Sequence, residues 1–302
     1  MNSHLVRSLP EDFVSVFADQ AVYKGDSGSE CEPGVSWEAL NRLLASDVLE
    51  YPRIRLVKEG EPFSRAFCGF MRHRQAANGG SIKTVNATIL TRLLGEGCTL
   101  VIDRCQGFFP GVQKHVEALG QFFRCPVSAS LYVNWGGRSG FGLHNDNHDV
   151  LALQVHGQKQ WAIYPDAPRS AVVKSFSKSA PAGEPGSRYG LSRGEFLYVP
   201  RGVWHSVYSE QTPSLHVSFT IFRPRYADLA GAILKALTHS HFMAESIPLN
   251  SERRRLEVFE RVMKSALSIE SIEYWAAYLE ENIPSTVQQA VDLSRAHGEQ
   301  EP

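Results

Sequence analysis

The sequence reads DVLALQVHG at residues 149–157 and KQWAIYP at residues 159–165, two apolar stretches that meet at a glycine. Stretches of about four to nine residues that are bounded by glycine, proline, serine or asparagine are typical of β-strands. Four similar stretches lie around these two, namely SASLYVNWG (128–136), GEFLYVP (194–200), WHSVYS (204–209) and SLHVSFTIF (214–222). Short strands joined by turns favour a jelly roll or barrel as the core of the protein.

Helical patterns flank these strands on both sides. Before the strands, we expect helices with polar breaks over residues 1–65, helices over 81–94 and 112–123, and a short buried strand over 98–103. After them, apolar residues at spacings of three and four predict helices over residues 226–237, 251–267 and 272–293. The segment 166–192 is rich in Ser, Pro, Gly and Lys and is expected to be a long loop, either a lid or a substrate-facing insertion.

This order of patterns predicts a mainly β protein with flanking helices. We expect an N-terminal helical and mixed part over residues 1–125 that packs on the core, the strand-rich core over 126–225, and a C-terminal helical module over 226–302. A chain of 302 residues is long enough for one large domain and a smaller appendage. The apolar faces of the last helices would suit a homodimer, although such stripes more often pack within one chain.

Composition and charge argue against several classes of function. The 31 basic and 32 acidic residues give a formal net charge of -1 and form no long runs, so the charge favours neither a nucleic-acid nor a membrane partner. No stretch approaches the roughly 18 apolar residues of a spanning helix and the start lacks a signal peptide, so we expect a cytoplasmic protein. The 5 cysteines are scattered without a C-x-x-C pair, which predicts reduced, mostly buried thiols.

The clearest chemistry lies in the stretch LHNDNHD at residues 143–149. On a strand, His144 and Asp146 are two residues apart and point to the same face, so both can reach one metal ion. A third ligand must come from another strand, and His205 is the best candidate because it follows the strand and Pro/Gly turn of GEFLYVPRGVW at 194–204. Two histidines and one carboxylate form the facial triad of non-haem Fe(II) oxygenases, which leaves positions open for a cosubstrate and dioxygen.

A second histidine in the same stretch, His148, competes for the role of ligand. No carboxylate lies two residues after it, whereas Asp146 lies two residues after His144. We therefore favour the pair His144 and Asp146. The preference depends on the strand register, because a shift by one residue would reverse the face on which both side chains lie.

Lys159 adds a positive charge to the same region. It lies fifteen residues after His144, at the start of the strand that follows the turn at Gly157, so its ammonium can point into the same barrel. A lysine at the end of a barrel is usually a solvated surface charge. Beside a facial triad, however, it can bind the far carboxylate of a dicarboxylate cosubstrate.

Together, HND at 144–146, GQKQW at 157–161 and LYVPRGVWH at 197–205 resemble the JmjC family, and most closely its cupin-like branch that includes the ribosomal oxygenases. The resemblance extends through ASLYV at 129–133, the glycine-rich segment 136–140 and SLHVSFT at 214–220, and so covers roughly residues 35–225. It implies a double-stranded β-helix (the cupin jelly roll) around Fe(II). The implied iron ligands are His144, Asp146 and His205, with Lys159 paired to the far carboxylate of 2-oxoglutarate and O2 as the oxidant.

The resemblance implies roles for further residues. Tyr132 matches a tyrosine near the active site of the family. Weaker candidates for hydroxyl contacts to the cosubstrate are Ser130, Ser218 and Thr220. His216 shares a strand face with two of these residues, and this face either lines the pocket or meets solvent. Trp161 and Trp204 are expected to be core aromatics.

The function implied by the resemblance is hydroxylation of an amino-acid residue in a protein or peptide, such as a ribosomal protein, with release of succinate and CO2. Asp146 favours hydroxylation over halogenation, because related halogenases have a small residue in its place, while demethylation stays open. The tail 226–302 is shorter than the dimerisation and winged-helix regions of the ribosomal oxygenases, so a free amino acid or small-molecule intermediate is the alternative substrate. Two alternative functions come from other classes of protein. A metal-dependent cupin isomerase would not need Lys159, and a non-catalytic binding module would not need three intact metal ligands.

Overall fold

The computed structural model describes most of the chain up to residue 225 and a helix near the C-terminal end. The described residues are 3–28, 33–58, 61–62, 70–75, 79–135, 140–164, 175–176, 183–209, 213–225, 228, 230–231 and 252–266. They belong to two units, Met1–Phe123 with Val127–Phe222, and Arg124–Pro126 with Arg223–Pro302. The strands and the candidate site all lie in the first unit.

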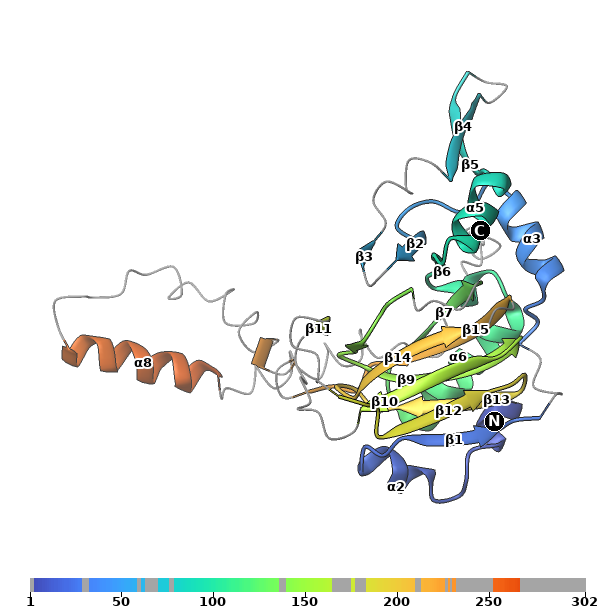
Figure 1. Cartoon of the computed structure of the whole chain (residues 1–302). Helices are drawn as coiled ribbons and strands as arrows, with labels where there is room; N and C mark the ends of the chain where they lie inside the picture. Colours follow the sequence, from blue (N-terminus) through green and yellow to red (C-terminus); the bar gives the residue numbers. More distant parts are fainter. Residues whose placement is uncertain are drawn as a thin grey trace, which may run out of the picture. The chain divides into compact units, whose positions relative to one another are not determined.

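The strands of the first unit form two sheets and a separate hairpin (Figure 1). The larger sheet has the order β1 (Tyr23–Asp26), β13 (Glu195–Val199), β9 (Asp149–His156), β15 (Ser214–Ile221), β7 (Val127–Asn134), β6 (Thr99–Ile102), β2 (Ile54–Lys58), β3 (Glu61–Pro62). The smaller sheet has the order β11 (Ser175–Phe176), β8 (His144–Asn145), β14 (Trp204–Ser209), β10 (Lys159–Tyr164), β12 (Ser187–Leu191). The hairpin pairs β4 (Met71–Gln75) with β5 (Ser81–Val85).

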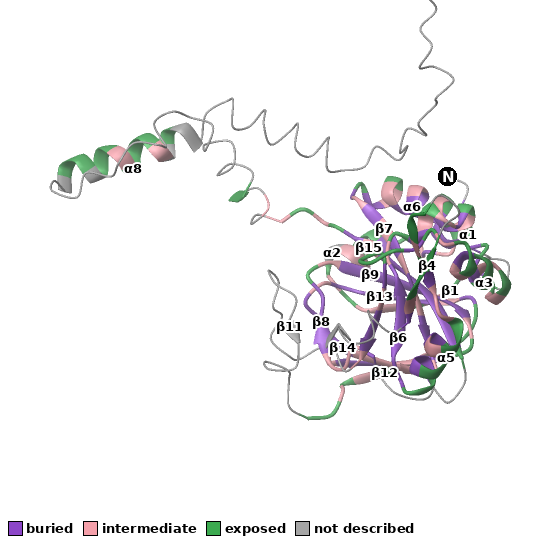
Figure 2. Ribbon diagram, turned by 90° about the horizontal axis from the view of Figure 1, so that it is seen from above, coloured by how far each residue is buried: buried purple, intermediate pink, exposed green. Residues whose placement is uncertain are grey.

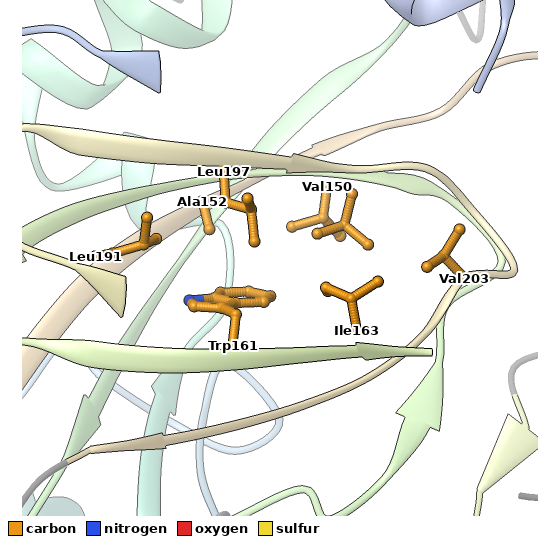
Figure 3. Packing of buried hydrophobic residues seen from close by; sticks show 8 residues of the cluster. Val150, Ala152, Trp161, Ile163, Leu191, Leu197 and Val203 are labelled. Atoms are coloured by element: carbon orange, nitrogen blue, oxygen red, sulfur yellow. The ribbon is translucent and has the colours of Figure 1, made fainter. Parts of the chain in front are cut away.

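The core lies between the two sheets. Figure 3 shows Trp161 and Ile163 of β10 pointing across to Ala152 and Leu197, which come from the larger sheet. The cluster consists of Val150, Ala152, Trp161, Ile163, Leu191, Leu197, Val199 and Val203. Alternate residues of each strand contribute to it, as the two-residue period of a strand requires. This arrangement of facing antiparallel sheets is the double-stranded β-helix that the sequence predicted.

Two of the helices in the first unit, α2 (Phe13–Ala18) and α6 (Pro110–Phe123), pack on the outer face of the larger sheet. The other described helices of this unit are α1 (His4–Arg7), α3 (Trp37–Ala45), α5 (Ala87–Gly95) and the short 3-10 helix η1 (Cys105–Gly107). The ring of His115 on α6 meets Phe219 of β15 edge to face, and Phe13 of α2 meets Tyr198 of β13 in the same way. Figure 2 shows the buried residues concentrated in the strands beneath these helices. The outward residues of β13 and β15 that meet these helices, Tyr198 and Phe219, are therefore aromatic and buried, as a covered face of a sheet requires.

Several helical predictions agree with the structure. The helix expected over 112–123 is α6, the buried strand expected over 98–103 is β6, and the helix expected over 251–267 is α8 (Glu252–Ala266) of the second unit. The helices expected over 226–237 and 272–293 lie for the most part outside the described residues, and the proposed homodimer surface with them. Of the cysteines, Cys98, Cys105 and Cys125 are buried and not in disulfides, as predicted, whereas Cys31 and Cys68 lie outside the described residues.

Three local predictions were wrong. The helix expected from residue 81 begins only at Ala87, because Asn86 caps it through the Ile89 amide, and 81–85 form the strand β5. The helical region expected over 1–65 contains the strands β1, β2 and β3. The loop expected over 166–192 ends in the strand β12, which pairs with β10; residues 165–174 and 177–182 lie outside the described residues. In each case the strand is held by a partner that local periodicity does not reveal.

No helix among the described residues is long and apolar enough to cross a membrane.

Candidate metal centre

Two neighbouring strands bring the three candidate ligands together. His144 of β8 and His205 of β14 are direct partners across an antiparallel pair, and Asp146 follows β8. The ligand atoms of these three side chains all lie within 4.8 Å of one another, and all three side chains are buried. Among the described residues this is the one group of histidine, cysteine or carboxylate side chains that converges in this way.

Backbone carbonyls fix the orientation of both imidazoles. Nδ1 of His205 lies 2.9 Å from the carbonyl oxygen of Val203, and Nδ1 of His144 lies 3.2 Å from that of Gly142. A carbonyl oxygen only accepts, so Nδ1 carries the proton in each ring and Nε2 is left with its lone pair. Both Nε2 atoms are therefore available as metal ligands.

The carboxylate of Asp146 completes the group. Its Oδ2 lies 3.8 Å from Nε2 of His144 and 3.7 Å from Nε2 of His205. These separations are too long for hydrogen bonds, so the three groups converge without bonding to each other, as ligands of one cation do. Their chemistry, two neutral imidazoles and a carboxylate, fits a divalent transition metal such as Fe(II).

A backbone hydrogen bond joins the two segments that carry the ligands. The amide of Gly202 donates to the carbonyl oxygen of Asp146 at 2.8 Å. Nearby, the amide of Arg201 donates to Oδ1 of Asp149 at 2.8 Å. The turn before His205 is thus tied to the segment that follows β8. By contrast, the competing ligand His148 lies outside the group and contacts the ring of Phe222.

Strand register places Lys159 on the same inner face as the histidines. On β10, Ile163 is the partner of His205 and Lys159 is the partner of Ser209. Because Lys159 and Ile163 are an even number of residues apart on one strand, their side chains lie on the same side of the sheet as that of His205. The side chain of Lys159 is only 3% exposed, and its Nζ lies 2.7 Å from Nδ1 of His216 on β15. Burial lowers the pKa of Lys159 to about 7. The buried amine of Lys159 therefore faces the interior of the barrel from the end opposite the candidate metal ligands.

Trp161 lies on the same face, between Lys159 and Ile163. Its ring stacks on that of His205 at 5.6 Å and meets that of His216 edge to face at 6.0 Å. The sequence predicts Trp161 to be chiefly a core aromatic, and its 3% exposure agrees with that prediction. Its position between the two ends of the site was missed, although the alternation of residues 159, 161 and 163 is visible in the sequence.

The remaining candidates lie on the facing sheet. Tyr132 of β7 stacks on His216 at 4.8 Å with the rings 5° from parallel, and burial raises the pKa of its hydroxyl. Ser218 is buried and Thr220 is half-buried on the same side of β15 as His216. The hydroxyl of Ser130 donates to Oδ1 of Asp103 at 2.9 Å.

Asp103 and its partner Arg55 were not singled out from the sequence. The guanidinium of Arg55 binds the carboxylate of Asp103 through two hydrogen bonds, of 2.9 and 3.1 Å. Both side chains are partly exposed, and Arg55 pairs with Val101 beside Tyr132. This polar pair extends the inner face of the larger sheet beyond the site. No local motif marks it, because its members come from β2 and from the residue after β6.

A double-stranded β-helix in which two histidines and one aspartate converge at one end defines the cupin-type metal-centre class. Within this class, residues 106–229 match the family model described as the JmjC domain. This part of the chain is therefore similar to the JmjC domain, the family that the motifs resemble.

Curated proteins also match part of the chain. The chain is 30% identical over 168 residues to "Bifunctional lysine-specific demethylase and histidyl-hydroxylase NO66" of Drosophila willistoni, which covers 52% of this chain and 22% of the relative. The protein of the same name from Dictyostelium discoideum is 34% identical over 145 residues, 46% of this chain and 28% of the relative. The match thus spans about a quarter of the length of these relatives.

Solved structures show the same fold. Escherichia coli ycfD superposes with a TM-score of 0.59 at 14% identity, over 89% of this chain and 70% of that chain. The structure of the Escherichia coli ribosomal oxygenase YcfD in complex with cobalt and 2-oxoglutarate superposes with a TM-score of 0.57 at 15% identity, over 90% of this chain and 72% of that chain. At this level of identity the likeness concerns the fold alone.

Proposed function

We propose that this protein is an Fe(II)- and 2-oxoglutarate-dependent oxygenase that hydroxylates an amino-acid residue of a protein or peptide and releases succinate and CO2. The observation that carries the proposal is the shared inner face of β8, β14 and β10. It holds His144 and His205 at one end and the buried cation of Lys159 at the other. A metal-binding group and a buried cation in one barrel match the two ends of a 2-oxo dicarboxylate.

His144, Asp146 and His205 would hold the iron. This donor set is the facial triad of non-haem Fe(II) oxygenases and leaves adjacent positions open for 2-oxoglutarate and O2. When bound, the iron supplies the activation of dioxygen for the oxidative decarboxylation of 2-oxoglutarate. The protein orients the two imidazoles before the metal binds, because a backbone carbonyl oxygen accepts a hydrogen bond from Nδ1 of each ring.

Lys159 would bind the far carboxylate of 2-oxoglutarate. Among the described residues it forms no ion pair, so an anionic ligand would supply the counter-charge that the buried ammonium lacks. Tyr132 and the hydroxyls of Ser218 and Thr220 face the same interior and are further candidates for contacts. Ser130 already donates its hydroxyl to Asp103, so its role toward the cosubstrate stays a prediction.

A side chain of a protein is the substrate class that we propose. The fly and amoeba relatives are named as lysine-specific demethylase and histidyl-hydroxylase, and the Escherichia coli structure is that of a ribosomal oxygenase. Both chemistries begin by inserting oxygen into a C–H bond of a protein side chain, so they share this substrate class. Ribosomal proteins are the first targets to test. The cytoplasmic location and the homodimer stay predictions.

The test is a search for an oxidised product. The full chain, loaded with Fe(II), is incubated with ribosomal proteins or peptides, 2-oxoglutarate and air, and the products are analysed by mass spectrometry. We expect one side chain to gain the mass of one oxygen atom, and the Asp146→Ala variant to leave it unchanged. A product found only on a free amino acid or small molecule would move the substrate to that class. Metal-dependent conversion of a substrate without 2-oxoglutarate would favour a cupin isomerase instead.

A further inference from the structure

The indole N–H of Trp161 is a buried donor without an acceptor. The side chain is 3% exposed, and its Nε1 has no hydrogen-bond partner among the described residues. Folded proteins pair nearly all buried donors, so an unpaired one calls for an explanation such as a ligand that the donor meets when the site is filled. Trp161 has the position for this, because its ring lies between His205 of the metal centre and His216 beside Lys159.

The indole nitrogen points toward the lysine end of the site. In Figure 3 the nitrogen of Trp161 is drawn on the side of the ring nearer Leu191 and away from Ile163 and Val203. Leu191 is the partner of Lys159 across β12 and β10, so this side of the ring faces the start of β10. The unpaired N–H and the ammonium of Lys159 therefore converge on one region of the barrel interior.

His216 fixes the ammonium from the other side. Nδ1 of His216 lies 2.7 Å from Nζ of Lys159, and the imidazole is held in place by its stacking on Tyr132. An ammonium has three hydrogens and the imidazole takes one, so two are left for a ligand. No carboxylate of the described residues forms an ion pair with Lys159, and a buried cation without a counter-charge points to an anionic ligand.

We propose that Trp161 and His216 complete the site for the far carboxylate of the cosubstrate: Trp161 donates its indole N–H to this carboxylate, and His216 holds the ammonium of Lys159 toward it. His216 is thus a positioning residue, and Trp161 is a direct binding residue. A carboxylate has two oxygens with several acceptor positions, enough for one bond from the indole and one or two from the ammonium. This inference rests on the proposed function, because it assigns further residues to the same cosubstrate site.

The test compares two ligands that differ only at the far end. 2-Oxoglutarate and 2-oxopentanoate share the 2-oxo acid group, but a methyl group replaces the far carboxylate in the second. Their affinities for the Mn(II)-loaded full chain are measured by calorimetry without oxygen, for the natural protein and for Trp161→Phe, which keeps a ring but removes the N–H. Trp37→Phe is the matched control, because Trp37 stacks on His156, a residue outside the described site.

We expect Trp161→Phe to weaken 2-oxoglutarate binding by about ten-fold or more, as for the loss of a hydrogen bond to a charged group, and to change 2-oxopentanoate binding by less than about two-fold. His216→Phe, which keeps the stacking but loses the acceptor, should show the same selective loss. An equal effect on both ligands, or none, would overturn the inference. A natural protein that binds 2-oxoglutarate no better than 2-oxopentanoate would instead overturn the proposed function.

A second measurement needs no variant. In the natural protein labelled with 15N-tryptophan, 2-oxoglutarate should move the indole resonance of Trp161 much further than 2-oxopentanoate does, since only the first brings an acceptor to the N–H. Equal shifts with both ligands would contradict the direct bond from Trp161 even if the variants fail to fold.

Discussion

Nζ of Lys159 lies 2.7 Å from Nδ1 of His216 inside the barrel, where both side chains are buried. Burial lowers the pKa of Lys159 to about 7, and burial together with the charge of Lys159 lowers the pKa of His216. The pair therefore carries at most one positive charge near neutral pH, which makes the lysine end of the site sensitive both to pH and to an anionic ligand.

Binding of 2-oxoglutarate should depend on the protonation of Lys159. Below a pH of about 7 the amine is charged before the ligand arrives; above it, the amine is neutral and must take up a proton on binding. We expect the affinity for 2-oxoglutarate to fall as the pH rises from 7 to 9, with up to one proton taken up per ligand. Calorimetry at pH 8 in buffers of different ionisation enthalpy measures this uptake.

The matched variant is Lys159→Arg, because a guanidinium stays charged throughout this pH range. Its binding of 2-oxoglutarate, even if weaker, should lose the proton uptake at pH 8. Proton uptake of the same size in this variant would place the titrating group elsewhere.

Loss of the Asp146 carboxylate should strongly weaken metal binding. Asp146→Asn keeps the size of the side chain but removes the charge, and we expect Mn(II) binding to weaken by more than about 100-fold, since changes in residues that merely support metal ligands already cost about 10- to 100-fold. His148→Ala is the control, because His148 lies outside the group of ligands, and it should bind Mn(II) as the natural protein does. Titration followed by electron paramagnetic resonance measures both. Retained affinity in Asp146→Asn would move the metal site elsewhere.

The convergence of the three candidate metal ligands was predictable because their geometry is local. His144 and Asp146 lie two residues apart near one strand, and His205 follows a recognisable strand and turn, so the sequence alone indicated all three. The partner of Lys159 was not predictable, because His216 reaches it from the facing sheet. The same limit explains the strands β2 and β12, whose partners lie far along the chain or in a polar segment that resembles a loop. Periodicity reveals the face of a strand but not its neighbour.

The turn before Lys159 should tolerate no side chain. Gly157 has a φ of +65°, and a Cβ there would collide with the backbone carbonyl oxygen of Pro213. Gly142 has the same φ, but a Cβ there would meet nothing within 4 Å. We expect Gly142→Ala to lower the free energy of unfolding by about 1 kcal/mol through backbone strain alone, and Gly157→Ala to lower it by about 2 kcal/mol or more. Urea denaturation compares them, and equal losses would contradict the collision.

Acid should destabilise the packing of α6. Burial, and then the neighbouring His4, lower the pKa of His115 to about 4, and its Nδ1 lies 2.7 Å from the hydroxyl of Ser3. The folded protein keeps His115 neutral while the unfolded chain takes up a proton below a pH of about 6.5. The free energy of unfolding should therefore fall between pH 6.5 and 4, by up to about 3 kcal/mol from this residue.

His115→Gln isolates this contribution, because glutamine does not titrate. Urea denaturation at a series of pH values should show a smaller loss of stability on acidification for the variant than for the natural protein. The same dependence on pH in both proteins would exclude His115 as the source.

The central claim is that the triad and Lys159 form one oxygenase site, and succinate production tests it most directly. Protein purified without oxygen is given Fe(II), 2-oxoglutarate and air, beside the Asp146→Ala variant. We predict slow formation of succinate by the natural protein even without its substrate, and none by the variant. No succinate from the natural protein, together with no detectable binding of 2-oxoglutarate, would contradict the assignment.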